Sequence, residues 1–210
     1  MKVLLLGATG GTGREIVRRA VAEGHSVVAL VRSILKANDL TGGATLVEGD
    51  ARDEAALASA LEGCSGVISS LGTPMSSFSE VTLLSTATRS IVNVMTQKKI
   101  RRLVCITGLG AGDSRGHGGF VFDKFILPLL LRKVYDDKNR QEDVIRSSSL
   151  DWVLVRPMVL NDNPGKGAVQ AQTDLSKIHG GSIARSDVAK FVVDQLTDDK
   201  WLHRSPLIKG

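Results

Sequence analysis

A cluster of glycines near the start of the chain has the spacing of a phosphate-binding loop. The segment Gly7-Ala8-Thr9-Gly10-Gly11-Thr12-Gly13 follows a short apolar run and precedes apolar residues at helical spacing. In this context Gly7 permits a tight turn, Gly10 lets the backbone approach a diphosphate, and Gly13 lets the helix pack closely against the sheet. Free N–H groups at the helix start attract an anion. We therefore expect dinucleotide binding here; the alternative is a purely structural glycine turn.

The end of the second predicted strand indicates which dinucleotide binds. It reads Val31-Arg32-Ser33 and carries no acidic residue to grip the ribose hydroxyls, as sites for NAD usually do. Arg32 can pair with a 2′-phosphate and stack on the adenine, and Ser33 can add a hydroxyl. We expect NADP(H) to be preferred over NAD(H). The alternative is an arginine that is simply exposed at a strand end.

Residues after the other predicted strands extend this site, because ligands gather at the carboxyl ends of parallel strands. Asp50 is placed either to accept from the adenine amino group or to serve as a turn or capping residue, and both readings stay open. Thr107 ends the fifth predicted strand, where the nicotinamide should lie. The remaining expected cofactor contacts are Ala51, Leu71, Gly72, Thr73, Lys138 and Pro157.

Apolar runs alternate with amphipathic stretches along the chain. The runs predict strands at Val3 to Leu6, Val27 to Val31, Ala44 to Val47, Val67 to Leu71, Leu103 to Thr107 and Trp152 to Val155, with an edge strand at Pro206 to Lys209. Helices are expected at 12–23, 54–61, 80–97, about 120–147 and 187–196, the last capped by Ser186. Segments 108–119 and 161–167 read as loops. Continuously apolar strands alternating with helices predict a doubly wound α/β fold: a mostly parallel sheet with helices on both faces.

Composition excludes several other classes of protein. The 210 residues fit one domain, 1–210, with 42% apolar and 23% charged residues. The formal charge of +5 is spread along the chain and aromatics are only 4%, so we expect no nucleic-acid partner. Two cysteines and four histidines lack metal-ligand spacing, which predicts no metal. No apolar run is long enough for a membrane span or a signal peptide, so we expect a cytoplasmic protein without membrane contact.

Several motifs together resemble the atypical short-chain dehydrogenases/reductases, in particular the NAD(P)-binding NmrA-like proteins and the biliverdin reductase B or NADPH-flavin reductase group. These motifs are the glycine segment, Val31-Arg32-Ser33, Glu48-Gly49-Asp50, Arg156-Pro157 and Ser186-Asp187-Val188-Ala189. The resemblance covers almost the whole chain. It implies a Rossmann-type sheet, with residues from about 157 to 210 contributing a small substrate region.

The resemblance also implies a catalytic serine, tyrosine and lysine, and this sequence departs from that pattern. Lys138 and Glu142 match the family's Lys-xxx-Glu spacing, but Val134 stands four residues before Lys138, where the tyrosine is expected. Tyr135 is one position away, about 100° around a helix, and is not accepted as a replacement acid. Lys138 either binds the nicotinamide ribose or pairs with Glu142 on the helix surface.

The family's serine falls at Thr107 or at Gly108, so Thr107 and Lys138 are the candidate catalytic residues. Reducing a ketone needs a positioned acid. A flavin or quinone delocalises the charge of the accepted hydride, and water can deliver the proton. We expect an NADPH-dependent oxidoreductase, monomeric or homodimeric, that transfers hydride to a flavin, quinone or similar conjugated acceptor. The alternative is an NADP-binding, redox-sensing regulatory protein without turnover.

Overall fold

A central sheet runs through the computed structural model, which describes residues 1–73, 81–114, 116, 131–176 and 180–210. Among these residues the sheet has eight strands in the order β3-β2-β1-β4-β5-β6-β10-β8. Their bounds are β1 Lys2–Leu6, β2 Ser26–Val31, β3 Ala44–Glu48, β4 Gly66–Ser69, β5 Arg102–Ile106, β6 Asp151–Pro157, β8 Gln170–Gln172 and β10 Leu207–Lys209. Strands β1 to β6 pair in parallel, and β10 pairs in parallel with β6 and antiparallel with β8. The fold is the predicted Rossmann-like α/β fold.

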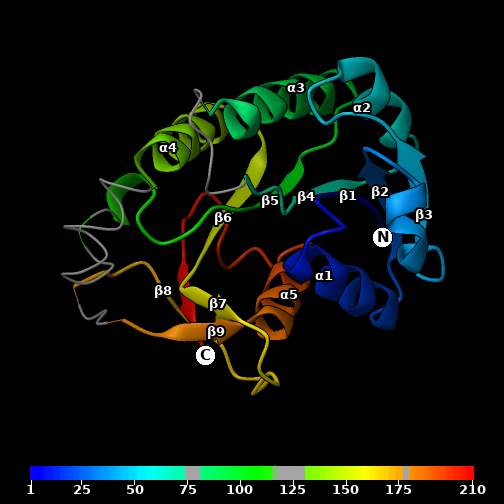
Figure 1. The fold of residues 1–210 in the computed structure, drawn as a ribbon. Helices are drawn as coiled ribbons and strands as arrows, with labels where there is room; N and C mark the ends of the chain where they lie inside the picture. The colour runs from blue at the N-terminus through cyan, green and yellow to red at the C-terminus, as the bar shows by residue number, and fades with distance from the viewer. Residues whose placement is uncertain (74–80, 115, 117–130, 177–179) are drawn as a thin grey trace.

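Helices cover both faces of this sheet (Figure 1). On one face α1, Gly11–Ala22, packs against α5, Arg185–Asp194. On the other face lie α2, Glu54–Ala60, α3, Leu83–Gln97, and α4, Arg132–Arg146. Two short 3₁₀ helices, η1 at Leu35–Leu40 and η2 at Gly112–Ser114, lie in connections. No helix in the described ranges is both long and apolar enough to cross a membrane.

Strand β1 shows why the apolar runs are continuous. Successive side chains of a strand point to opposite faces. Val3 and Leu5 therefore enter the core shared with α1 and α5, whereas Leu4 and Leu6 enter the core beneath α2 and α3. All four side chains are fully buried, so neither face of the strand tolerates a polar residue.

Two expectations about the C-terminal part are wrong. The last helix begins at Arg185, its N-cap is Ala184, and no side chain caps it, so Ser186 is not the cap. The strand expected at Pro206 to Lys209 forms as Leu207–Lys209 but lies between β6 and β8, so it is not at the edge. The strand β8, which supplies the true edge, is too short to show a periodic pattern.

Other short elements lie within or beside the expected loops. Strands β7, Val159–Asn161, and β9, Ser182–Ala184, pair in parallel as a separate two-stranded sheet. The expected loop 108–119 contains η2, so it is not wholly irregular. The first part of the helix expected at about 120–147 lies outside the described residues, and α4 begins at Arg132.

Candidate functional site

A cavity of about 600 Å³ opens at the carboxyl end of the parallel sheet, where the sequence places a cofactor. The loops that follow β1 to β5 contribute to its wall, together with the last residue of β6, α4 and the start of α5. Expected cofactor contacts in the wall are Gly7, Thr9, Gly10, Gly11, Thr12, Arg32, Asp50, Ala51, Leu71, Gly72, Thr107, Lys138 and Pro157. Gly13, Ser33 and Thr73 lie beside these residues in the chain but do not line the cavity.

The backbone contacts around Gly7, Gly10 and Gly13 explain why the loop has glycine at these positions. Gly7 has a φ of +80°, and a Cβ there would lie 2.3 Å from the Ser70 carbonyl oxygen. A Cβ on Gly13 would lie 2.1 Å from the Gly7 carbonyl oxygen, so the helix can pack this closely only with glycine. A Cβ on Gly10 would meet only the Gly7 oxygen, at 3.5 Å. The side of Gly10 that faces the cavity is thus open to a ligand.

The start of α1 is free to bind an anion. Its N-cap, Gly10, has no capping side chain, and its first turn contains no acidic residue. The first N–H groups of a helix have no partner within the helix and carry a partial positive charge. The loop therefore offers close backbone approach and N–H donors at one place, which fits a diphosphate.

Asp50 and Arg52 form a bidentate pair in the loop that follows β3. Arg52 donates from Nε and Nη2 to the two Asp50 carboxylate oxygens, at 2.9 and 2.7 Å, and from its backbone N–H at 2.9 Å. These bonds lower the pKa of Asp50 to about 2. Asp50 thus is a turn residue and also lines the cavity. Arg52, which also lines it, was missed because an arginine after a turn is unremarkable in sequence.

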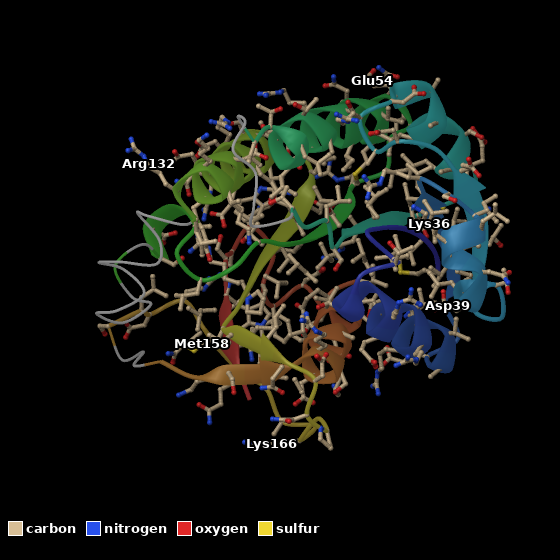
Figure 2. The ribbon with its side chains drawn as sticks, viewed as in Figure 1. Lys36, Asp39, Glu54, Arg132, Met158 and Lys166 are labelled. Carbon is tan, nitrogen blue, oxygen red and sulfur yellow. The ribbon has the colours of Figure 1, made fainter. Side chains whose placement is uncertain are left out.

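Arg32 is exposed at the end of β2 and forms no hydrogen bond or ion pair with the described part of the chain. Two nearby basic residues do not line the cavity. Arg14 pairs with Asp39, which lies beside α1, and Lys36 extends from η1 (Figure 2). Arg32 is thus available for a ligand at this end.

Thr107 and Lys138 meet at the other end of the cavity. The Lys138 Nζ donates to the Thr107 carbonyl oxygen at 2.5 Å. The Thr107 hydroxyl donates to the Glu142 Oε1 at 2.8 Å. Burial lowers the pKa of Lys138, although the nearby Glu142 and Cys105 oppose that shift. Within the described residues Lys138 forms no ion pair with Glu142, so the surface-pair alternative for Lys138 is wrong.

Glu142 pairs with Arg156 instead. Arg156 donates from Nε at 3.0 Å and from Nη2 at 2.6 Å to the two carboxylate oxygens. The Arg156 Nη2 also lies 2.7 Å from Asp113. Arg156 therefore forms salt bridges within the fold. It also fixes Glu142, and through it the Thr107 hydroxyl.

The expected tyrosine position is occupied by a buried valine. Val134 is 8% exposed and lies outside the cavity wall. The neighbouring Tyr135 donates its hydroxyl to the Leu109 carbonyl oxygen at 2.8 Å, and its ring lies 5.3 Å from the Lys138 Nζ. The described part of the cavity wall contains no tyrosine. Tyr135 therefore does not stand in for the missing acid in this structure.

Arg185 is another cavity residue that the sequence analysis missed, although it directly precedes the Ser186-Asp187-Val188-Ala189 motif. It is the first residue of α5, and it contacts Thr12, 173 positions earlier in the chain. Only the packing of α5 beside α1 brings the two together. Leu160, the middle residue of the short β7 strand, also lines the cavity.

Comparisons with known proteins agree with the geometry of this cavity. Residues 7–199 match the family described as NAD(P)H-binding. A Bacillus subtilis relative, the uncharacterized sugar epimerase YhfK, is 30% identical, with 98% of this chain and 92% of the relative covered. The solved structure of ChuY, an anaerobilin reductase from Escherichia coli O157:H7, is 26% identical with a TM-score of 0.82, covering 100% of this chain and 97% of ChuY.

A Veillonella parvula short-chain dehydrogenase/reductase solved in complex with NADP has a TM-score of 0.83. It is 18% identical, and 100% of this chain and 94% of that chain are covered. At this identity the likeness shows a shared fold alone.

Proposed function

Because the chain belongs to the NAD(P)H-binding family, we propose that it is an NADPH-dependent reductase of a flat, conjugated acceptor. Flavins, quinones and linear tetrapyrroles are the acceptors in question. One observation above all supports the proposal. The glycine loop and the residues after β2, β3 and β4 line one cavity, and Lys138 and Thr107 stand at its far end, but buried Val134 takes the place of the family's acid.

Different residues of the cavity would bind different parts of the dinucleotide. The glycine loop and the start of α1 would bind the diphosphate. Arg32 would pair with the 2′-phosphate, which is why we propose NADPH over NADH. Lys138 would hold the nicotinamide ribose, since its amine is fixed against the Thr107 carbonyl oxygen. When bound, the cofactor supplies the hydride.

The acceptor class follows from what the described cavity wall lacks. A ketone becomes an alkoxide as it is reduced and needs a proton from a positioned acid. A conjugated ring system spreads the same charge over many atoms, so water suffices as the proton source. Apolar Ile106, Pro157 and Leu160 line the cavity near Thr107 and suit the face of a planar ring. The likeness to ChuY, an anaerobilin reductase, supports a tetrapyrrole among the acceptors.

The name of the Bacillus subtilis relative raises sugar epimerisation as another possibility. Epimerisation through a transient ketone also needs a group that takes up and returns a hydroxyl proton. The loss of tyrosine at Val134 counts against that reaction for the same reason that it counts against ketone reduction. We therefore place this chain with the reductases, near the biliverdin reductase B and NADPH-flavin reductase group.

The test is NADPH consumption, followed by absorbance, with FMN, riboflavin, a benzoquinone and biliverdin each added in turn. NADPH binding is measured separately by calorimetry. Gly13→Val is the control variant, because a Cβ at this position collides with the Gly7 carbonyl oxygen. Consumption that depends on one of the acceptors, and is lost in Gly13→Val, supports the reductase. Tight NADPH binding with no consumption would favour the alternative, a regulatory protein that senses NADP.

A further inference from the structure

We propose that Arg185 binds the cofactor diphosphate, and that Asp162 is the counter-ion it releases when the cofactor arrives. This inference rests on the proposed cofactor site. It adds a binding residue from the C-terminal part of the chain, far in sequence from the glycine loop.

The Arg185 side chain lies flat along the glycine loop. A Cβ built on Gly11 would be 3.0 Å from both the Cδ and the Nε of Arg185. The bare backbone of Gly11 thus makes room for this arginine. The Arg185 Nη1 donates to the Thr12 hydroxyl at 3.2 Å, and the side chain lines the same cavity as Gly10 and Gly11. Its guanidinium therefore stands beside the N–H groups expected to receive the diphosphate.

The charge on Arg185 is only loosely neutralised. Its Nε donates to the Asp162 Oδ1 at 2.9 Å, but the Asp162 side chain is 84% exposed. Exposed ion pairs contribute little, because water competes with both partners. Asp162 does not line the cavity. A diphosphate inside the cavity can thus replace Asp162 without leaving a buried carboxylate unpaired.

A purely structural role for Arg185 makes different demands. In that case Arg185 would hold α5 and the end of β7 against the glycine loop. Removing it would then weaken the binding of every ligand and lower the stability of the fold. A diphosphate-binding residue acts on ligands that contain a diphosphate and spares those that do not. The two roles are therefore separable by the choice of ligand.

Calorimetric titrations with ADP-ribose, adenosine 2′-monophosphate, NADP⁺ and NAD⁺ distinguish the two roles. ADP-ribose contains the diphosphate and lacks the 2′-phosphate, whereas adenosine 2′-monophosphate has the reverse. We expect Arg185→Ala to weaken the binding of ADP-ribose, NADP⁺ and NAD⁺ by about tenfold or more, and the binding of adenosine 2′-monophosphate by less than about twofold. Arg32→Ala should weaken the binding of adenosine 2′-monophosphate strongly and the binding of ADP-ribose little. Arg101→Ala, which breaks the distant pair with Asp151, is the charge-matched control and should change none of them.

Asp162→Asn provides a second, independent test of the proposal. It replaces the competing carboxylate with an uncharged side chain of the same size, so ADP-ribose should bind as tightly as in the wild type or several times more tightly. This variant also carries the test if Arg185→Ala does not fold.

Unchanged ADP-ribose binding in Arg185→Ala would overturn the inference and leave the proposed function standing. An equal loss of every ligand, with a lowered melting temperature, would assign Arg185 the structural role and overturn it as well. Weaker ADP-ribose binding in Asp162→Asn would show that Asp162 assists the diphosphate, contrary to the proposal. A wild-type protein that binds no dinucleotide would remove both the inference and the proposed function.

Discussion

Arg156 and Glu142 form a bidentate ion pair in the interior, with each side chain 1% exposed. The pair joins strand β6 to helix α4. The same carboxylate accepts the Thr107 hydroxyl, at the end of the proposed cofactor site. The position of Thr107 therefore depends on an ion pair that lies behind the cavity wall.

Removing the Glu142 carboxylate should destabilise the fold, because it leaves the buried Arg156 charge without its main partner. We expect Glu142→Ala to lower the free energy of unfolding by about 3–5 kcal/mol, measured by urea denaturation. Asp151→Ala is the matched control: it breaks the exposed bidentate pair with Arg101 and should cost no more than about 1 kcal/mol. Similar losses in the two variants would show that the buried pair has no special weight.

Arg32 should determine the preference for the 2′-phosphate. We expect Arg32→Ala to weaken NADPH binding by about tenfold or more, because it removes a charged contact, and to leave NADH binding nearly unchanged. Binding of both cofactors is measured by calorimetry. Equal losses for NADPH and NADH would mean that Arg32 does not contact the 2′-phosphate.

Lys138 and Tyr135 should differ sharply in their effect on turnover. Lys138→Met removes the amine that lines the cavity and should lower kcat/KM for NADPH by about tenfold or more. Tyr135→Phe removes the hydroxyl that donates to the Leu109 carbonyl oxygen and keeps the ring beside Lys138, so kcat/KM should change by less than about threefold. The steady-state rates of both variants are compared with one acceptor. A large loss in Tyr135→Phe would restore Tyr135 as an acid.

Cys105 should make stability fall in alkali. Burial raises the pKa of its thiol from 9.0 to about 12. The neutral thiol is favoured in the folded state, so its contribution is complete below pH 9 and is lost as pH rises towards 12. Relative to Cys105→Ala, the wild type should lose up to about 1.4 kcal/mol of unfolding free energy per pH unit in this window. Urea denaturation at several alkaline pH values measures the difference. A difference that stays constant with pH would contradict the expectation.

The sequence predicted the sheet and the glycine loop because both leave local signals. Buried strands such as Val27 to Val31 read as continuous apolar runs. Gly7 and Gly13 belong to a glycine spacing that is visible within seven residues, although the contact that excludes a side chain at Gly7 comes from distant Ser70. The contributions of Arg185 and Leu160 left no such signal. They depend on how α5 and the short strand β7 pack against the loop, and three-residue strands are too brief for periodicity to reveal.

The Glu142 network shows the same limit at a finer scale. The spacing of Lys138 and Glu142 favours an ion pair on a helix surface as much as a cofactor contact. In the structure Arg156, on strand β6, binds the Glu142 carboxylate, so Glu142 does not pair with Lys138. A partner supplied by tertiary packing thus outweighs a pair suggested by helical spacing.

We infer a conjugated acceptor above all because no tyrosine lines the described part of the cavity. The most direct test compares NADPH oxidation by the wild type with FMN, a benzoquinone or biliverdin against oxidation with a simple ketone or aldehyde at equal concentration. We predict acceptor-dependent oxidation with at least one conjugated compound and none above background with the carbonyl compounds. Faster oxidation with the ketone or aldehyde would contradict a conjugated acceptor, since it would require an acid that Val134 cannot provide.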